Sequence, residues 1–230
     1  MTSDAMPSDY DELNRLMSLL TGDEKHRPSA TSTLDVIWVL YDQILSITPE
    51  NLDDPTRDRF VVSKGHGPVA YYAVLAAKGF LTEDQLLDFA SYDSRLGHHP
   101  DRLLVPGVEF SSGSLGHGLP ASVGMAHGLR AQGIGSRVIC LIGDAEFDEG
   151  SNSEAVVYAG SVGLANLTAV VIDNQSSSHG WTGGIGSRFE IEGWRVHDVN
   201  GRDHDAIARA FRDHPADRPT VVVAHVEPKG

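Results

Sequence analysis

Two nearly continuous apolar runs with a helical segment between them constrain the fold of this chain more than any other feature. Residues 137–142 and 167–173 each have the composition of a buried strand, and residues 153–162 between them have the apolar spacing of a helix. Strands joined by a crossover helix lie parallel, and a strand that is apolar along its whole length needs cover on both faces. The sequence therefore predicts an α/β fold: an open, mostly parallel sheet with helices on both faces.

The rest of the chain fits the same architecture. Apolar spacing predicts helices over residues 10–20, 34–47, 68–78, 81–92, 119–131 and 205–213, and strands over residues 59–62, 195–199 and 220–226. Two long segments rich in glycine and serine, residues 97–118 and 174–186, are predicted to be loops, and such loops are usually functional. We expect residues 1–9 to form a flexible N-terminal tail and residues 10–230 to form a single domain.

Composition and charge exclude several classes of function. The formal net charge of −14 disfavours a protein that binds nucleic acid through its phosphates. No run of the sequence approaches the roughly 18 consecutive apolar residues of a membrane-spanning helix, and the acidic N-terminal segment does not resemble a signal peptide. Cys140, the single cysteine, lies in an apolar run and is expected to be a buried thiol. We therefore expect a cytoplasmic protein that binds neither nucleic acid nor membrane.

Polar residues stand where the two apolar strands end. Gly143 and Asp144 follow the first strand, and Asn174 follows the second. Both strand ends meet at the carboxyl edge of the sheet, where open α/β folds bind ligands and where a glycine lets the backbone approach one closely. A carboxylate and a carboxamide oxygen suit Mg²⁺ or Ca²⁺, which completes its shell with phosphate oxygens and water. The pair predicts a metal that bridges to a phosphorylated ligand, although an ordinary strand-end Asp and turn Asn remain the alternative.

Several collinear motifs resemble the transketolase family of thiamine-diphosphate enzymes. Gly143-Asp144-Ala145 and the later Asn174 resemble the family's cofactor motif, which begins Gly-Asp-Gly and ends in Asn. Residues 60–67, 97–100, 106–109, 112–116 and 149–155 match further family motifs in the same order. The resemblance runs from about His26 to Val226 and implies the family's diphosphate-binding (PP-type) fold, with thiamine diphosphate and Mg²⁺ or Ca²⁺ as cofactors.

The resemblance assigns cofactor-binding roles by position. It implies that Asp144, Asn174 and the backbone carbonyl of Ser176 hold the metal ion. His66, at the N-terminus of a predicted helix, would contact the diphosphate, where helix N–H groups favour an anion. The carbonyl of Gly113 would meet the aminopyrimidine, and Leu115 would bend the cofactor; a helix cap and a core leucine are the alternatives for His66 and Leu115. The implied cofactor site is His66, Gly113, Leu115, Gly143, Asp144, Ala145, Asn174 and Ser176.

The resemblance also implies a set of catalytic residues. His26 and His99 match histidines of the transketolase substrate channel, where they contact hydroxyl groups and move protons, a task for a side chain that titrates near neutral pH. Glu149 and Glu154 match acidic residues at the subunit contact, which couple to a glutamate of the partner domain. A solvated helix face is the alternative explanation of these two glutamates.

Three departures qualify the resemblance. Ala145 replaces a family glycine, and its methyl group is expected to crowd the backbone beside the diphosphate. His179 stands where transketolases often have Asp. The sequence also ends at Gly230, before a loop that brings another histidine to the family's cofactor and substrate, so ordinary sugar-phosphate chemistry does not follow from the resemblance alone.

The resemblance implies a second polypeptide. In full-length transketolases a pyrimidine-binding domain follows this one and carries the glutamate that activates the cofactor. Because the present sequence ends at Gly230, we expect a partner subunit to supply that glutamate and most contacts to the substrate. The expected assembly is an α₂β₂ heterotetramer.

Several functions compete at this point. The leading hypothesis is transfer of a two-carbon ketol unit from a ketose or ketose phosphate donor to an aldose phosphate. The acceptor could instead be a carrier-protein or lipoyl thiol, as in a hybrid of transketolase and pyruvate dehydrogenase. A second class is the α-type subunit of a 2-oxoacid dehydrogenase or decarboxylase. A third class is a non-enzymatic subunit, and this third class is disfavoured by the retained Asp144, Asn174, His66 and His99. A nucleotide-binding domain is disfavoured because no Gly-x-Gly-x-x-Gly follows an early strand.

Overall fold

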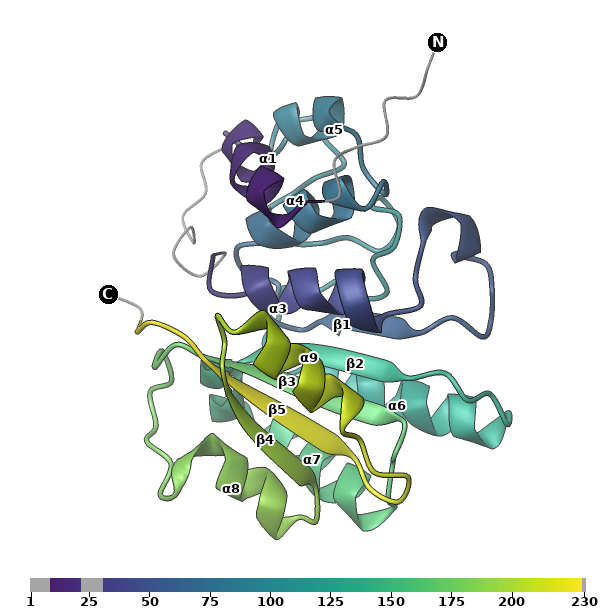
Figure 1. Ribbon diagram of the computed structural model, residues 1–230, viewed down its shortest axis with the longest axis vertical. Coiled ribbons are helices and arrows are strands. Elements are labelled where there is room, and N and C mark those ends of the chain that lie inside the picture. Colours follow the sequence, from purple (N-terminus) through teal and green to yellow (C-terminus); the bar gives the residue numbers. More distant parts are fainter. Residues whose placement is uncertain (1–8, 22–30, 229–230) are drawn as a thin grey trace.

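The computed structural model describes residues 9–21 and 31–228. Within these residues five strands form one parallel sheet in the order β1-β2-β3-β5-β4 (Figure 1). The predicted α/β fold is therefore confirmed, and β1 and β3 have the predicted bounds. The strands are β1 (Arg59–Val62), β2 (Val138–Gly143), β3 (Leu167–Asp173), β4 (Arg195–Asn200) and β5 (Thr220–His225).

Alternate residues of the strands face two separate hydrophobic layers. Ile139 and Leu141 of β2 belong to the cluster under α1, α3, α4 and α9, whereas Val138, Cys140 and Ile142 belong to the cluster under α6, α7 and α8 (Figure 1). Both faces of β2 are therefore buried, as its continuous apolar run predicted. The helices are α1 (Leu13–Leu19), α3 (Leu34–Val39), α4 (Val69–Ala77), α5 (Glu83–Leu87), α6 (Gly118–Ala131), α7 (Gly150–Ser161), α8 (Gly184–Ile191) and α9 (His204–Arg212).

Helix α4 fixes the position of the segment that leaves β1. All residues of α4 are buried, and a helix that is apolar all round needs cover on every side. Helices α1, α3 and α5 pack against it, and α1, α4 and α5 form a layer beyond α3 in Figure 1. The ring of Tyr71 also meets Phe60 of β1 edge-on, with 5.8 Å between the ring centroids. Residues 63–68 are thus held between a buried strand and a buried helix.

Three expectations about helices need correction. The helix expected over residues 34–47 ends in a π-helical turn at Ile44, because Leu45 is already extended. The helix expected over residues 81–92 is only Glu83–Leu87 long, and Ala90 then adopts a left-handed φ of 59°. Helix α8 was not predicted, since its first residues belong to the expected loop over residues 174–186. Glycine has a low helix propensity, but tertiary packing of α8 overrides it.

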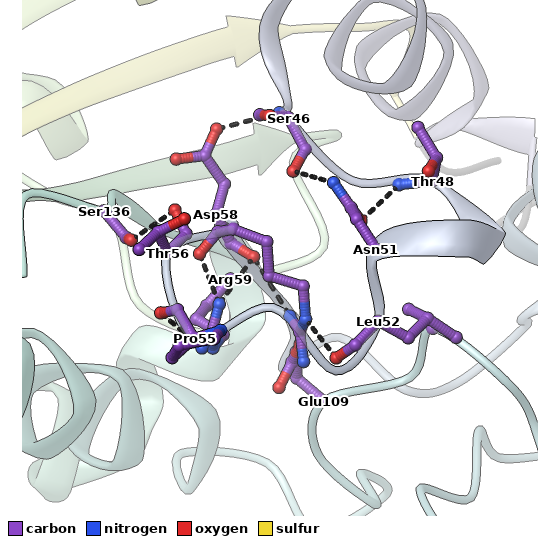
Figure 2. A network of polar contacts seen from close by, with 12 residues as sticks. Ser46, Thr48, Asn51, Leu52, Pro55, Thr56, Asp58, Arg59, Glu109 and Ser136 are labelled. Carbon is purple, nitrogen blue, oxygen red and sulfur yellow. Dashed lines mark hydrogen bonds and ion pairs between the residues drawn. The ribbon is translucent and has the colours of Figure 1, made fainter.

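A polar network at the amino edge of the sheet joins the starts of β1 and β2. The Asp58 carboxylate, directly before β1, accepts a hydrogen bond from the backbone N–H of Ser46 at 2.9 Å (Figure 2). It also accepts one from the Arg137 guanidinium at 2.5 Å. Ser136 donates its hydroxyl to the carbonyl oxygen of Thr56 at 2.6 Å. These bonds fix the edge opposite to the one where the predicted ligand residues lie. Among the described helices none is long and apolar enough to cross a membrane.

Candidate active site

The carboxyl ends of β1, β2 and β3 bring the predicted site residues to one edge of the sheet. Gly143 of β2 lies opposite Ile172 of β3 in the parallel register. Asp144 and Asn174 therefore leave neighbouring strands close to the same level. His66 leaves the same edge, four residues after the last residue of β1. This convergence is the one that the predicted crossover between residues 142 and 167 requires.

Asp144 connects the end of β2 to the loop that follows β3. Its carboxylate accepts the Ser176 hydroxyl and the Ser176 backbone N–H, each at 2.6 Å, and the Ser177 backbone N–H at 3.1 Å. The side chain is buried, with 1% of the residue exposed. The structure thus brings together Asp144 and Ser176, two of the residues proposed to hold the metal.

Asn174 is a second buried polar residue of this edge. Its side-chain oxygen Oδ1 is buried and has no hydrogen-bond partner within the described part of the chain. A buried acceptor without a partner is unfavourable, so it calls for an explanation such as an absent ligand or ion. The described residues hold no group of three or more His, Cys, Asp and Glu side chains that could bind a metal by themselves. The donors fit a hard cation that takes further oxygens from a bound ligand.

Two histidines and a glycine converge beside this edge. The rings of His66 and His99 meet edge-on, with centroids 4.8 Å apart. Gly113 has a φ of 139°, and a Cβ atom there would lie 3.0 Å from Cδ2 of His99. Only glycine suits both that backbone angle and that space. The loop of residues 112–116 is therefore seated directly against His99, and the nearby hydroxyl oxygen of Ser112 is buried without a partner within the described residues.

Glu146 is a site residue that the sequence analysis did not single out. It is 1% exposed, and its carboxylate accepts the Ser63 hydroxyl at 2.6 Å and the backbone N–H groups of Gly116 and Gly143 at 3.1 and 3.0 Å. Burial raises the pKa of Glu146, while these bonds and the charge of Lys64 oppose that rise. The sequence signal was an acidic residue three positions after a strand-end glycine, the spacing of a capping box.

The space beside Gly143 holds a side chain of the protein. A Cβ atom at Gly143 would lie 3.2 Å from Cδ of Lys64, which is itself 8% exposed. The glycine thus makes room for Lys64, a contact that the sequence analysis did not predict. Ala145 has a negative φ, so its methyl group imposes no backbone strain, and its N–H donates to Asp144 at 2.9 Å.

The other predicted residues lie in different surroundings. Leu115 is partly exposed, in the loop before α6. The carboxylates of Glu149 and Glu154 are exposed at the start of α7, and a Cβ atom at Gly116 would lie 2.6 Å from Cβ of Glu149. Glu149 therefore packs on the loop of residues 112–116, whereas Glu154 faces outward one turn later. His26 lies outside the described residues.

Comparison with known proteins identifies the family of this chain. Residues 21–226 match the family model described as transketolase, thiamine diphosphate binding domain. The chain belongs to the transketolase family. This membership confirms the family resemblance and agrees with the parallel α/β sheet. It also supports thiamine diphosphate as the cofactor of this domain.

Two curated relatives of the chain have different names. It is 56% identical over 219 residues to "Ferredoxin fas2" of Rhodococcoides fascians, covering 94% of this chain and 72% of that protein. It is 35% identical over 207 residues to one of the subunits of the apulose-4-phosphate transketolase of Actinobacillus succinogenes, covering 87% of this chain and 75% of that protein.

A solved transketolase shares the fold. The complex of the Pichia stipitis transketolase with sedoheptulose 7-phosphate superposes with a TM-score of 0.83 and 26% sequence identity. The match covers 95% of this chain and 36% of the solved one. The present chain thus spans about a third of the length of that transketolase.

Proposed function

We propose that this chain is the diphosphate- and Mg²⁺-binding subunit of a thiamine-diphosphate-dependent enzyme that transfers a two-carbon ketol unit from a ketose or ketose phosphate donor. The observation that carries this proposal is the buried Oδ1 of Asn174, which has no partner among the residues that the structure describes, at the same sheet edge as the buried Asp144 carboxylate. Membership of the transketolase family supports the choice of cofactor.

The metal is held, in this proposal, by Asp144, Asn174 and the backbone carbonyl of Ser176. Two side-chain oxygens and one carbonyl leave room for phosphate oxygens, which is how Mg²⁺ usually binds in such sites. Ca²⁺ accepts the same kinds of donor. In the structure the Ser176 hydroxyl and N–H occupy the Asp144 carboxylate. Loading the ion would therefore exchange at least part of these hydrogen bonds for metal bonds.

The remaining residues would bind and orient the cofactor and the substrate. Thiamine diphosphate supplies an electron sink, and the protein supplies geometry and electrostatics. His66 would contact the diphosphate, and the Gly113 carbonyl and Leu115 would set the conformation of the cofactor. His99, whose exposed ring lies against His66, would contact substrate hydroxyls and move protons, with His26 in the same role.

Activity would require a second polypeptide with a pyrimidine-binding domain that supplies the activating glutamate. A relative whose name marks it as one subunit of a transketolase supports a split enzyme. The exposed carboxylates of Glu149 and Glu154 would contact this partner. We propose an α₂β₂ heterotetramer in the cytoplasm.

Replacing Asp144 tests the metal assignment. In the complex with the partner subunit, Asp144→Ala should weaken Mg²⁺-dependent binding of thiamine diphosphate by about 100-fold or more, because loss of a residue that merely orients a metal ligand already costs roughly 10- to 100-fold. Titration calorimetry at several Mg²⁺ concentrations measures this. Asp205→Ala, at an exposed carboxylate of α9, is the matched control and should bind like the wild type. Wild-type affinity in Asp144→Ala would overturn the assignment.

An assay of the same complex identifies the acceptor of the two-carbon unit. The complex is given a ketose phosphate together with either an aldose phosphate or an acyl-carrier or lipoyl domain. Turnover of the aldose phosphate at the higher rate would support ordinary transketolase chemistry. Turnover that depends on the carrier would support the hybrid enzyme instead.

A second candidate function is oxidative, with a 2-oxoacid as donor and an iron–sulfur protein as electron acceptor. The name of the 56% identical relative, "Ferredoxin fas2", favours it. A cluster needs several thiolate ligands, and this sequence has only the buried Cys140, so the redox centre would lie outside the present sequence. Consumption of pyruvate coupled to reduction of a one-electron dye, without consumption of a ketose, would favour this function over ketol transfer.

A further inference from the structure

We propose that Glu146 is a positioning residue that holds the two halves of the cofactor site in register. One half is the strand end with Gly143 and Asp144, proposed for the metal and the diphosphate. The other is the loop of residues 112–116, proposed for the two rings of the cofactor. This inference rests on the proposed function and adds to it a residue that touches neither metal nor cofactor.

The carboxylate of Glu146 lies where three chain segments meet. Oε1 accepts the Ser63 hydroxyl at 2.6 Å and the Gly116 N–H at 3.1 Å, and Oε2 accepts the Gly143 N–H at 3.0 Å. Ser63 follows β1, Gly116 ends the loop, and Gly143 ends β2. The carbonyl of Glu146 itself accepts the Asn152 side chain at 2.8 Å. Helix α7 thereby anchors the backbone from which the carboxylate extends.

Ser63 extends the connection to the start of α6. Its hydroxyl donates to Glu146 and accepts the Gly118 N–H at 3.1 Å. The loop is thus held at Gly116 and again at Gly118. The carbonyl of Gly116 also accepts the Ser151 hydroxyl at 2.7 Å. Leu115 directly precedes this doubly held segment, so its place relative to β2 depends on the Glu146 carboxylate.

The loop has little freedom to sit elsewhere. A Cβ atom at Gly118 would overlap the side chain of Ser63, and one at Gly116 would lie 2.6 Å from Glu149. Close backbone packing of this kind leaves no room for a shifted loop without loss of the hydrogen bonds. The hydrogen bonds of the Glu146 carboxylate therefore fix how far Gly116 of the loop lies from Gly143 at the end of β2.

A carboxylate is the side chain that these donors require. Its two oxygens accept all three bonds, whereas glutamine presents one oxygen and an NH₂ group that accepts none. In Glu146→Gln at least one of the buried N–H groups of Gly116 and Gly143 would face the NH₂ group. A buried donor left without an acceptor is unfavourable, so the loop and the strand end would separate.

The test compares the binding of thiamine diphosphate with that of inorganic pyrophosphate, which corresponds to its diphosphate part alone, in the complex with the partner subunit. Glu146→Gln should weaken binding of thiamine diphosphate about tenfold or more at saturating Mg²⁺, because one buried hydrogen bond to a charged group is lost. Inorganic pyrophosphate with Mg²⁺ occupies only the diphosphate half, and its affinity should fall less than about threefold, since both metal ligands remain. Titration calorimetry measures both affinities.

The matched control is Asp58→Asn. Asp58 is also a buried carboxylate that accepts a backbone N–H, but it lies at the amino edge of the sheet. Asp58→Asn and Glu146→Gln should both lower the thermal midpoint of unfolding. Only Glu146→Gln should lower the affinity for thiamine diphosphate. Ser63→Ala is a milder second variant. It should lower the affinity for thiamine diphosphate several-fold and leave the affinity for Mg²⁺–pyrophosphate unchanged.

Three results would overturn the inference. Wild-type affinity for thiamine diphosphate in Glu146→Gln and Ser63→Ala would remove the positioning role. Equal losses of affinity for thiamine diphosphate and for pyrophosphate would mean that Glu146 supports only the half of the site that binds the metal and the diphosphate. Failure of the wild-type complex to bind thiamine diphosphate would instead reject the proposed function itself.

Discussion

Buried polar residues at the carboxyl edge of the sheet differ in how fully they are satisfied. Glu146 has acceptor bonds to three donors, whereas Oδ1 of Asn174 has no partner within the described residues. A satisfied buried group makes a structure specific, and an unsatisfied one calls for an explanation such as a ligand, an ion or a water molecule. At the scale of single residues, this contrast separates a residue that supports the site from one that would bind within it.

Ala145→Gly tests whether the alanine disturbs the site. Because the backbone of Ala145 already has a negative φ, glycine there should lower the free energy of unfolding by about 0.5–1 kcal/mol through its larger conformational freedom. Affinity for thiamine diphosphate should stay within about twofold, since no strain is relieved. Urea denaturation and titration calorimetry measure the two quantities. A tenfold gain in affinity would show instead that the methyl group crowds the diphosphate.

Among the elements, α8 shows best how tertiary contacts decide a helix. Its sequence begins with glycines, yet Ile185 and Phe189 are buried one turn apart. The Phe189 ring packs edge-on against Phe147 and Trp194, with centroid distances of 5.3 and 5.0 Å. Burial of such aromatic rings outweighs the low propensity of the glycines.

Two glycines inside helices should respond to alanine with opposite signs. A Cβ atom at Gly160 of α7 would overlap the carbonyl oxygen of Glu192, so Gly160→Ala should destabilise the chain by about 1–3 kcal/mol or more. At Gly124 of α6 nothing lies within 4 Å of the added atom, and Gly124→Ala should stabilise the isolated chain by up to about 1 kcal/mol. Chemical denaturation of both variants checks this. A neutral Gly160→Ala would mean that α7 can move away from residue 192.

Across the whole molecule, the two edges of the sheet have different tasks. The amino edge is held by the ion pair of Asp58 with Arg137, and the carboxyl edge carries the loops of the site. The Asp58–Arg137 pair joins the starts of β1 and β2, and the ladder between β2 and β3 brings the ends of those two strands level. The fold thus separates the residues that stabilise it from those that would bind the cofactor.

The amino edge should make the chain sensitive to acid. Burial works to raise the pKa of Asp58, but hydrogen bonds from Arg137 and from the Ser46 N–H outweigh it and lower the pKa in the folded state. The resulting stabilisation is present above the unfolded pKa of about 3.9 and is lost as pH falls through the lower folded value. Asp58→Asn should therefore lower the free energy of unfolding by roughly 1–3 kcal/mol at neutral pH.

The same variant should also flatten the dependence of stability on pH in the acid range. Urea midpoints measured from about pH 6 to about pH 3 compare the slopes of wild type and Asp58→Asn. Asp35, which is also buried and has a lowered pKa from its bonds to Tyr10, His204 and Arg202, stays intact in both chains. Identical slopes would mean that Asp58 contributes no acid-dependent stability.

Local pattern alone determined the sheet and the convergence of its strand ends. Residues 59–62 and 167–173 were predicted as strands with their observed bounds, because runs of apolar residues must be buried on both faces. The crossover between β2 and β3 then places Asp144 near the level of Asn174 whatever the details of packing. Family motifs in the sequence were sufficient to recognise the transketolase resemblance.

Only the tertiary structure decided how the site is held. Glu146 finds its partners Ser63 and Gly116 at separations of 83 and 30 residues along the chain, and Lys64 fills the space beside Gly143. Helix α8 likewise depends on packing between segments, because its Phe189 lies against the rings of Phe147 and Trp194. Periodicity reports which faces of an element are buried, whereas the partner of a buried polar group depends on how distant segments pack.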